Sequence, residues 1–370
     1  MNLNPGIFRE YDVRGEVNKD LDPFIAEGVG KAFGTYIGKG TVVVGGDVRL
    51  STEELKAALI SGILSTGIDV VDIGTVPTPV LYFALYHGHL DGGVQVTASH
   101  NPPQFNGFKI CSGREAIYGE EIQKLRWLME REEYKRGKGG MTSKEVIPLY
   151  LTYLKERNHV ERGLRVAIDC GNGCAGLVVP QLMKDLGVDI TELHCEPDGN
   201  FPHHFPDPTV PANLGDIIKE VREKKLDLGL AYDGDGDRLG VVDEKGRIVW
   251  PDEFMVLFYN EILAKSPGAP CPIEVKCSQA LWEEVERLGG KPEFCCTGHS
   301  LIKARMKETG APFCGEMSGH LFFADEYFGF DDAIYASLRL LRILSGKGQC
   351  LSELLQDIPR YYNTPEIRIS

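Results

Sequence analysis

One supersecondary pattern occurs three times along the chain and limits it to an α/β architecture. Each copy contains a short apolar strand, a turn, an amphipathic helix and a second strand, and the copies begin near residues 42, 166 and 273. In the first copy, Leu55, Leu59 and Ile63 recur at the four-residue spacing of a helix, and Ser51 with Glu54 has the pattern of a capping box. The alternation predicts three related α/β domains with mixed, mostly parallel sheets sandwiched by helices.

The 370 residues suit several domains of about 100 residues each. A charged segment followed by a Gly-rich stretch predicts the first boundary, and a second boundary is expected near residue 250. The segment 361–370 resembles a linker followed by one strand, so we expect it to begin a further, missing domain. The three predicted domains span residues 1–141, 145–247 and 252–360.

Composition excludes several classes of protein. The formal net charge is −14, which argues against binding to a nucleic-acid backbone. No apolar stretch reaches 18 residues, so no membrane span is expected, and the N-terminal residues lack the pattern of a signal peptide. The ten cysteines form no C-x-x-C pair, which favours reduced thiols and a cytoplasmic protein.

A Ser-His pair follows the strand-like segment 93–96, within Thr97-Ala98-Ser99-His100-Asn101-Pro102. Ligands of α/β proteins collect at the carboxyl ends of strands, so Ser99 is a candidate nucleophile or phosphate carrier. Ser, Asn and Pro also form ordinary turns, and such a turn is the alternative. No G-x-S-x-G motif is present, which argues against an acyl hydrolase.

Three aspartates alternate with glycines after the apolar run 228–232. Asp233, Asp235 and Asp237 would lie on one side of an extended loop, where only a cation offsets their repulsion. Carboxylates are hard ligands, so Mg²⁺ or Ca²⁺ is indicated. An EF-hand is rejected because its sixth position requires Gly and is Arg238 here, and the flanking segments are strand-like. A solvated acidic turn is the remaining alternative.

A third polar loop contains Glu316, Ser318 and His320 between glycines. This mixture suits hydrogen bonding to a polyhydroxylated ligand, although an ordinary polar loop is the alternative. Several further residues could be functional or could be surface charges and satisfied core groups: Arg9, Tyr11, Arg14, Lys276, His299 and Lys303.

Five segments together resemble the α-D-phosphohexomutase family, in its phosphomannomutase/phosphoglucomutase branch. They are FREYDVRG, TASHNPPQFNGFK, DGDGDR, TGHSLIK and GEMSGH, and they span nearly the whole chain in the family's order. The resemblance implies a central cleft, a phosphoserine at Ser99, and Mg²⁺ held by Ser99, Asp233, Asp235 and Asp237. It implies catalytic roles for Arg14, Lys109 and His299, and substrate contacts from Tyr11, His100, Arg238, Lys276, Glu316, Ser318 and His320.

The implied activity is that of an isomerase that interconverts hexose 1-phosphate and hexose 6-phosphate, with mannose or glucose as the sugar. Phospho-Ser99 would donate its phosphoryl group, and glucose 1,6-bisphosphate or mannose 1,6-bisphosphate would act as activator. Lys109, with a lowered pKa, or His299 would take the hydroxyl proton. We expect a small phosphosugar as the partner, without nucleic acid or membrane, and a monomer or weak homodimer.

The family's fourth, phosphate-binding domain has no counterpart here, so the resemblance implies a truncated form with impaired activity. Three alternatives remain at this point. One is a phosphoglucosamine mutase, although Met317 in GEMSGH resembles the mannose and glucose version of the loop. The others are a Mg²⁺-dependent sugar phosphatase and a non-catalytic metal-binding module.

Overall fold

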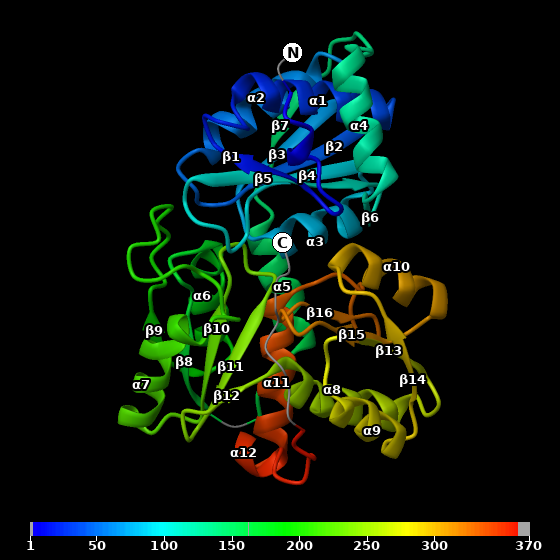
Figure 1. Cartoon of the computed structure of the whole chain (residues 1–370). Coiled ribbons are helices and arrows are strands. Elements are labelled where there is room, and N and C mark those ends of the chain that lie inside the picture. Colours follow the sequence, from blue (N-terminus) through cyan, green and yellow to red (C-terminus); the bar gives the residue numbers. More distant parts are fainter. Residues whose placement is uncertain (1–2, 162, 362–370) are drawn as a thin grey trace.

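The structure is a computed structural model that describes residues 3–161 and 163–361. It contains three α/β units, and each copy of the repeated pattern lies in a different unit (Figure 1). The predicted start of a further domain at 361–370 lies, apart from its first residue, outside the described residues. Among the described residues, no helix combines the length and apolar character needed to cross a bilayer.

The first unit is built on a seven-stranded sheet in the order β1-β5-β4-β2-β3-β7, with β6 beside β5. The central strands are parallel, and β5 runs antiparallel to its neighbours. Helices α1, α2 and α4 cover one face, and α3 lies on the other (Figure 1). The elements are η1 (Pro5–Ile7), β1 (Val13–Glu16), α1 (Pro23–Ile37), β2 (Thr41–Gly46), α2 (Thr52–Leu64), β3 (Asp69–Thr75), α3 (Thr78–Gly88), β4 (Gly92–Val96), β5 (Phe105–Ser112), β6 (Glu115–Ala116), α4 (Glu120–Arg131) and β7 (Met141–Ser143).

The second unit has a five-stranded sheet in the order β12-β11-β10-β8-β9. Alternate residues of its strands face α6 and α7, because successive strand side chains point to opposite faces. Strand β10 leads directly into the loop of three aspartates, and β11 leads out of it. The elements are α5 (Ile147–Arg157), β8 (Arg165–Asp169), η2 (Cys174–Leu177), α6 (Val179–Asp185), β9 (Asp189–Leu193), η3 (Pro211–Leu214), α7 (Gly215–Lys224), β10 (Leu228–Tyr232), β11 (Leu239–Asp243) and β12 (Ile248–Val249).

The third unit contains a parallel pair of strands, an antiparallel pair and the surrounding helices. Helix α11 is buried along most of its length and packs against α8 and against β11 of the second unit. The elements are α8 (Pro251–Lys265), β13 (Pro270–Glu274), α9 (Gln279–Arg287), β14 (Lys291–Cys295), α10 (His299–Thr309), β15 (Phe313–Gly315), β16 (Leu321–Phe323), α11 (Ala333–Lys347) and α12 (Leu351–Leu354).

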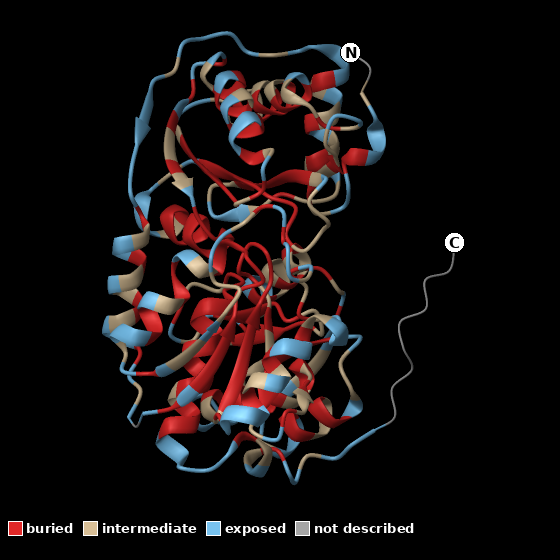
Figure 2. Ribbon diagram, turned by 90° about the vertical axis from the view of Figure 1, so that its left-hand side faces the viewer, coloured by how far each residue is buried: buried red, intermediate tan, exposed pale blue. Residues whose placement is uncertain are grey.

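Helix α3 connects the units, because it belongs to the first sheet but packs into a core shared with the other two. Phe83 contacts Tyr150 and Tyr153 edge-on at centroid distances of 5.4 and 5.3 Å. Tyr82 contacts Phe330 of the third unit at 5.5 Å. The buried core therefore continues from the lower units up to α3 rather than stopping at the boundary (Figure 2).

The α/β prediction is confirmed, with two differences in detail. Ser51 makes no capping hydrogen bond to α2, because its hydroxyl accepts a hydrogen bond from the Asn106 side chain at 2.9 Å instead. The Gly-rich stretch before residue 141 also packs on the first unit: Gly137 and Gly139 donate backbone hydrogen bonds to the segment after α2, and β7 extends the sheet at β3. All ten cysteines are free thiols.

Candidate active site

Ser99 lies just after β4, at the edge where the parallel strands of the first sheet end. Its backbone has a left-handed φ of 51°, and its side chain is 2% exposed. The Oγ atom donates to Asp233 Oδ2 at 2.6 Å and lies 3.0 Å from His100 Nδ1. Burial and the nearby Arg238 lower the pKa of His100, so this imidazole is neutral. The Ser99 backbone is therefore strained, and its buried hydroxyl points to a carboxylate of the second unit.

Arg49 holds the Ser99 loop in place, although no motif in the sequence marks this residue. This guanidinium is fully buried, and its Nε donates to Asp47 at 3.1 Å. Its two terminal nitrogens donate to four carbonyls of the loop, at 2.5–3.1 Å: those of Ser99, Asn101, Pro102 and Phe105. Arg14 adds a bond to the Asn101 side chain at 2.8 Å and pairs with Asp12. The loop is therefore fixed by charged donors on both sides.

The three aspartates lie together between β10 and β11, and each is fully buried. Burial and the negative charges of Asp237 and Asp235 raise the pKa of Asp233. Within the described chain, one oxygen each of Asp235 and Asp237 has no hydrogen-bond partner. Thr78, at the start of α3, donates to Asp235 at 2.5 Å. Unpartnered carboxylate oxygens beside a serine hydroxyl are a donor set that fits Mg²⁺.

Lys109 on β5 also reaches this cluster. Its Nζ lies 2.7 Å from Asp235 Oδ2 and also contacts Asp237. Burial lowers the pKa of Lys109, but the charges of Asp235 and Asp237 outweigh burial and raise it. The carboxylates around the ammonium group therefore favour its charged form, which is opposite to the lowered pKa that proton acceptance by Lys109 would require.

The loop with Glu316, Ser318 and His320 joins the aspartate loop through backbone and side-chain contacts. Arg238 Nε lies 3.0 Å from His320 Nε2, and the two residues form an isolated antiparallel bridge. Glu316 is buried and accepts hydrogen bonds from Gly298 N at 2.7 Å and from Ser318 Oγ at 2.8 Å. The third unit thus presents this loop directly to the second.

His299 begins α10 and is held next to His320, with ring centroids 5.6 Å apart. Burial, and then the charge of Lys303, lower the pKa of His299 well below its usual value, so the imidazole is neutral. Asp331, which sequence reasoning missed, lies 3.3 Å from His320 Nδ1 and 3.7 Å from His299 Nδ1. Asp331 comes directly before Asp332, which caps α11, so the local sequence looks like an ordinary helix start.

Tyr11 connects the first unit to the third, since its hydroxyl donates to the Thr297 carbonyl at 3.0 Å. Its ring lies over Gly298, where a Cβ would be 2.6 Å from Tyr11 Cζ. Lys276 is partly exposed, and its Nζ lies 3.8 Å from Glu274. Tyr11 and Lys276 thus contact Thr297 and Glu274 of the third unit.

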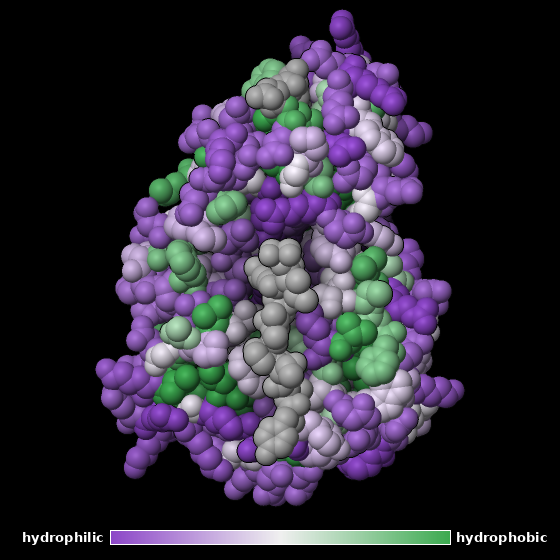
Figure 3. Space-filling view, viewed as in Figure 1, coloured by the Kyte–Doolittle hydropathy of each residue, from purple (hydrophilic) through white to green (hydrophobic). Residues whose placement is uncertain are grey.

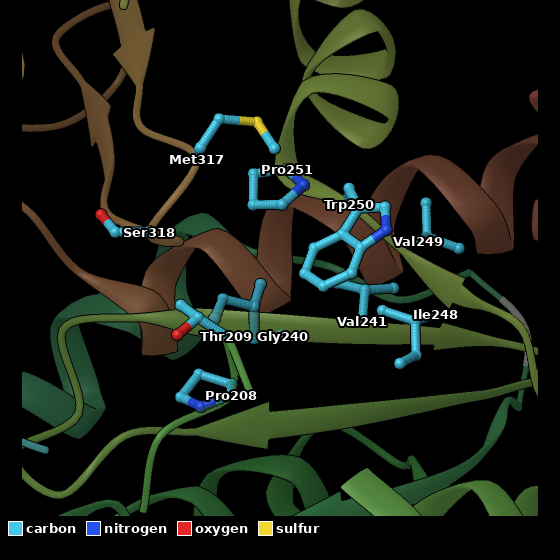
Figure 4. Close-up of a pocket in the computed structure, with 11 residues that line it drawn as sticks. Pro208, Thr209, Gly240, Val241, Ile248, Val249, Trp250, Pro251, Met317 and Ser318 are labelled. Carbon is cyan, nitrogen blue, oxygen red and sulfur yellow. The ribbon is translucent and has the colours of Figure 1, made fainter. Parts of the chain in front are cut away.

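The surface is hollowed between the first unit and the other two, and hydrophilic side chains border this hollow (Figure 3). A separate small pocket lies where the third unit meets the second (Figure 4). Met317 and Ser318 face Pro208, Thr209 and Trp250 across it, and none of the three aspartates lines it. This pocket lies beside the loop that contains Glu316, Ser318 and His320.

Comparison with known proteins assigns all three units. Residues 5–136, 148–246 and 250–362 match alpha/beta/alpha domains I, II and III of the phosphoglucomutase/phosphomannomutase family. A phosphomannomutase/phosphoglucomutase of Pseudomonas aeruginosa is 44% identical over the whole chain and 80% of its own length. A phosphoglucomutase of Neisseria gonorrhoeae is 42% identical over the whole chain and 81% of its length. A crystal structure of a family protein from Burkholderia thailandensis aligns with a TM-score of 0.95 and 43% identity, over 98% of this chain and 81% of that one.

Proposed function

The chain belongs to the phosphoglucomutase/phosphomannomutase family, and from this premise we propose that it interconverts the 1- and 6-phosphates of mannose and glucose. The names of the relatives support this reaction and these sugars. The observation that carries the proposal is the Ser99 hydroxyl, which lies 2.6 Å from one of three buried carboxylates. The proposed cofactor is Mg²⁺, held by Asp233, Asp235, Asp237 and Ser99.

The proposed reaction moves a phosphoryl group between Ser99 Oγ and a sugar hydroxyl. In the first half, the Oγ–P bond of phospho-Ser99 breaks and an O–P bond to the sugar forms, which gives a hexose 1,6-bisphosphate. In the second half, the turned bisphosphate returns its other phosphoryl group to Ser99. Bound Mg²⁺ would offset negative charge on the transferring phosphoryl oxygens. Arg14 and Arg49 keep the Ser99 loop in position for both halves.

The attacking hydroxyl must lose a proton in each half: the sugar hydroxyl in the first half, and the Ser99 hydroxyl in the second, when the departing sugar oxygen gains one. His299 is the acceptor that we favour, because its imidazole is neutral and its Nδ1 has no hydrogen-bond partner within the described chain. Lys109 remains charged beside Asp235 and Asp237, so its proposed role is to neutralise phosphoryl charge. His100 is neutral and lies 3.0 Å from Ser99 Oγ, where it can orient the hydroxyl.

The proposed sugar contacts come from Glu316, Ser318 and His320, with Arg238, Lys276 and Tyr11 at the border. Glu316 already accepts two hydrogen bonds from its own unit, so its carboxylate is held in one orientation before a sugar arrives. Such preorganisation reduces the ordering cost of binding. Hydroxyl groups of the hexose would then pair with carboxylate oxygens that have further lone pairs.

The test is transfer of labelled phosphate from glucose 1,6-bisphosphate to the protein in the presence of Mg²⁺. We expect one phosphate per chain, located on Ser99 by peptide mass spectrometry, and production of hexose 6-phosphate from the 1-phosphate without release of inorganic phosphate. Ser99→Ala should abolish the label and the turnover. Ser143→Ala, on the exposed edge strand β7, is the matched control and should retain both.

Two results would contradict the proposal. Stoichiometric release of inorganic phosphate would identify a phosphatase, since a mutase conserves the phosphate on the sugar. Retention of label and turnover by Ser99→Ala would place the nucleophile elsewhere. Faster turnover of glucosamine 6-phosphate than of mannose 6-phosphate would leave the mutase reaction intact but change its sugar.

A further inference from the structure

A second cluster of metal-ligating side chains lies at the carboxyl ends of β8 and β9, outside the groups used for phosphoryl transfer. It consists of Asp169, His194 and His204, whose donor atoms all lie within 4.8 Å of one another. We propose that these three residues bind a transition metal ion of the Zn²⁺ class. This inference depends on residues of the second unit alone and does not require the proposed mutase reaction.

His204 is oriented as a metal ligand would be. Its Nδ1 lies 2.9 Å from the Phe205 carbonyl, which can only accept, so Nδ1 carries the proton. Its Nε2 lies 3.1 Å from Asp169 Oδ2, and a proton or a metal ion between these two atoms offsets the carboxylate charge. A metal ion here would take the place of that proton, because only the deprotonated Nε2 binds it. A carbonyl that fixes the far ring nitrogen is the usual outer partner of a metal-bound histidine.

The remaining imidazoles are held beside this pair. His194 stacks on His203 with ring centroids 4.0 Å apart, and His194 Nε2 lies 3.2 Å from Asp216 Oδ2. His203 Nδ1 pairs with the Asn172 side-chain oxygen at 2.8 Å. Neutral imidazole is the form that binds a metal ion. Asp216 would then act as an outer partner of His194.

The donor set selects the class of ion. Imidazole nitrogen suits Zn²⁺, Cu²⁺ and Ni²⁺, whereas Mg²⁺ prefers the all-oxygen set of Asp233, Asp235 and Asp237. Three protein donors with an open fourth position are common for Zn²⁺. Tetrahedral bonds of about 2.1 Å place donors about 3.4 Å apart, so a small rotation of the side chains would close the site. His194 and His204 are 13% and 16% exposed, which leaves the ion a path from solvent.

An ion here would fasten the loop after β9 to the end of β8. The chain after β8 continues through Gly171 to Gly173. Gly173 packs closely on the aspartate loop, since a Cβ on it would lie 2.7 Å from the Gly234 carbonyl oxygen. Cys174 N also donates to that carbonyl at 2.9 Å. The proposed ion would therefore stabilise the backbone that supports the aspartate loop from behind.

The test uses the full chain, freed of metal by a chelator and then supplied with excess Mg²⁺ to fill the all-oxygen site. Co²⁺ is the probe, because its visible absorption reports nitrogen ligands and low coordination number, and Zn²⁺ is the competitor. We expect one Co²⁺ per chain, displaced by Zn²⁺. His194→Ala and His204→Ala should each weaken Co²⁺ binding by about 100-fold or more, since even the loss of an outer partner costs about 10- to 100-fold. His159→Ala, which changes an exposed histidine, should bind as the parent does.

Asp235→Asn separates the two sites, because it should leave the Co²⁺ absorption intact. The proposal is overturned if His204→Ala keeps the absorption or if Asp235→Asn removes it. Should the histidine variants fail to fold, anomalous scattering from a Zn²⁺-soaked crystal of the parent decides. We expect an anomalous density peak between Asp169 and His204. Zn²⁺ found only at other positions would overturn the proposal.

Discussion

Arg49 is the residue on which the geometry of the nucleophile depends most, although it does not contact the reacting atoms. One buried guanidinium donates to four carbonyls of the Ser99 loop and to Asp47. Backbone carbonyls are identical in every residue, so no sequence pattern marks a side chain that binds them. Ser99 beside His100, and the three aspartates at alternate positions, could be predicted as candidates because each short segment carries the chemistry in its own residue types. Arg49 and Asp331 could not, because only the tertiary fold brings them to the site.

We predict that Arg49→Lys lowers the rate of Ser99 phosphorylation by at least about tenfold and the free energy of unfolding by about 3 kcal/mol. An ammonium group cannot span the fork of contacts that the guanidinium makes, and breaking a buried charged pair costs about 3–5 kcal/mol. Label transfer from glucose 1,6-bisphosphate and urea unfolding measure the two effects.

Arg114→Lys is the control, since Arg114 is exposed and makes a single carbonyl contact, to Tyr86. A positioning role for Arg49 requires the turnover number to fall more than the apparent affinity for sugar phosphate. If Arg49→Lys unfolds more easily but is phosphorylated at the parent rate, Arg49 serves stability alone.

At the scale of the elements, hydrophobic periodicity was sufficient to predict the three copies of the strand–helix–strand pattern. The first copy, expected to begin near residue 42, contains the strands Thr41–Gly46 and Asp69–Thr75, because apolar runs between turn residues are strong local signals. The role of α3 could not be predicted in this way. Its apolar residues fit any buried helix, and only the fold shows that they pack against aromatic rings of two other units.

Helix α11 begins at a buried acid whose ionisation should be visible in the stability of the chain. Asp332 caps the helix by accepting from Tyr335 N at 2.8 Å and also accepts from the hydroxyls of Tyr150 and Tyr327. Burial outweighs these hydrogen bonds and raises the pKa of Asp332 from 3.8 to about 6. The folded state therefore binds this proton more tightly than the unfolded state does, and the contribution of Asp332 to stability falls as pH rises from 4 to 6.

We predict that Asp332→Asn removes this part of the pH dependence. The parent should lose about 2 kcal/mol between pH 4 and pH 6.5 relative to Asp332→Asn, because one pKa unit corresponds to about 1.4 kcal/mol and most of the shift is titrated within this window. Urea unfolding of both proteins at the two pH values gives the difference directly. Parallel stability profiles for the two proteins would show that Asp332 has an ordinary pKa, whatever the absolute cost of losing a hydrogen-bond acceptor.

At the scale of the whole molecule, Gly298 and Tyr11 form one of the contacts between the first unit and the third. Gly298 has a φ of 128°, and a Cβ there would lie 2.6 Å from Tyr11 Cζ. We predict that Gly298→Ala displaces Tyr11 and lowers kcat/KM by about tenfold or more, with backbone strain of about 1–3 kcal/mol added to the contact. Turnover of mannose 1-phosphate and thermal unfolding measure both effects.

The matched control lies at the other end of the same helix. Gly310 also has a positive φ, of 69°, but a Cβ there would have nothing within 4 Å. Gly310→Ala should therefore lose some stability and keep its kcat/KM. Equal losses of kcat/KM in the two variants would show that strain in α10, and not the contact with Tyr11, affects turnover.

The hydroxyl, the carboxylates and the imidazoles of the site come from three separately built units, which has a consequence for how variants of this enzyme should be screened. A substitution at a contact between two units can leave nearly all of the buried core, and so the resistance to heat, intact while it alters the angle between those units. Selection on melting temperature would pass such a variant, and selection on turnover would discard it. Turnover therefore reports how well the units are aligned. In an unbiased library, the most informative substitutions should lie at the contacts between units, far from the atoms that react.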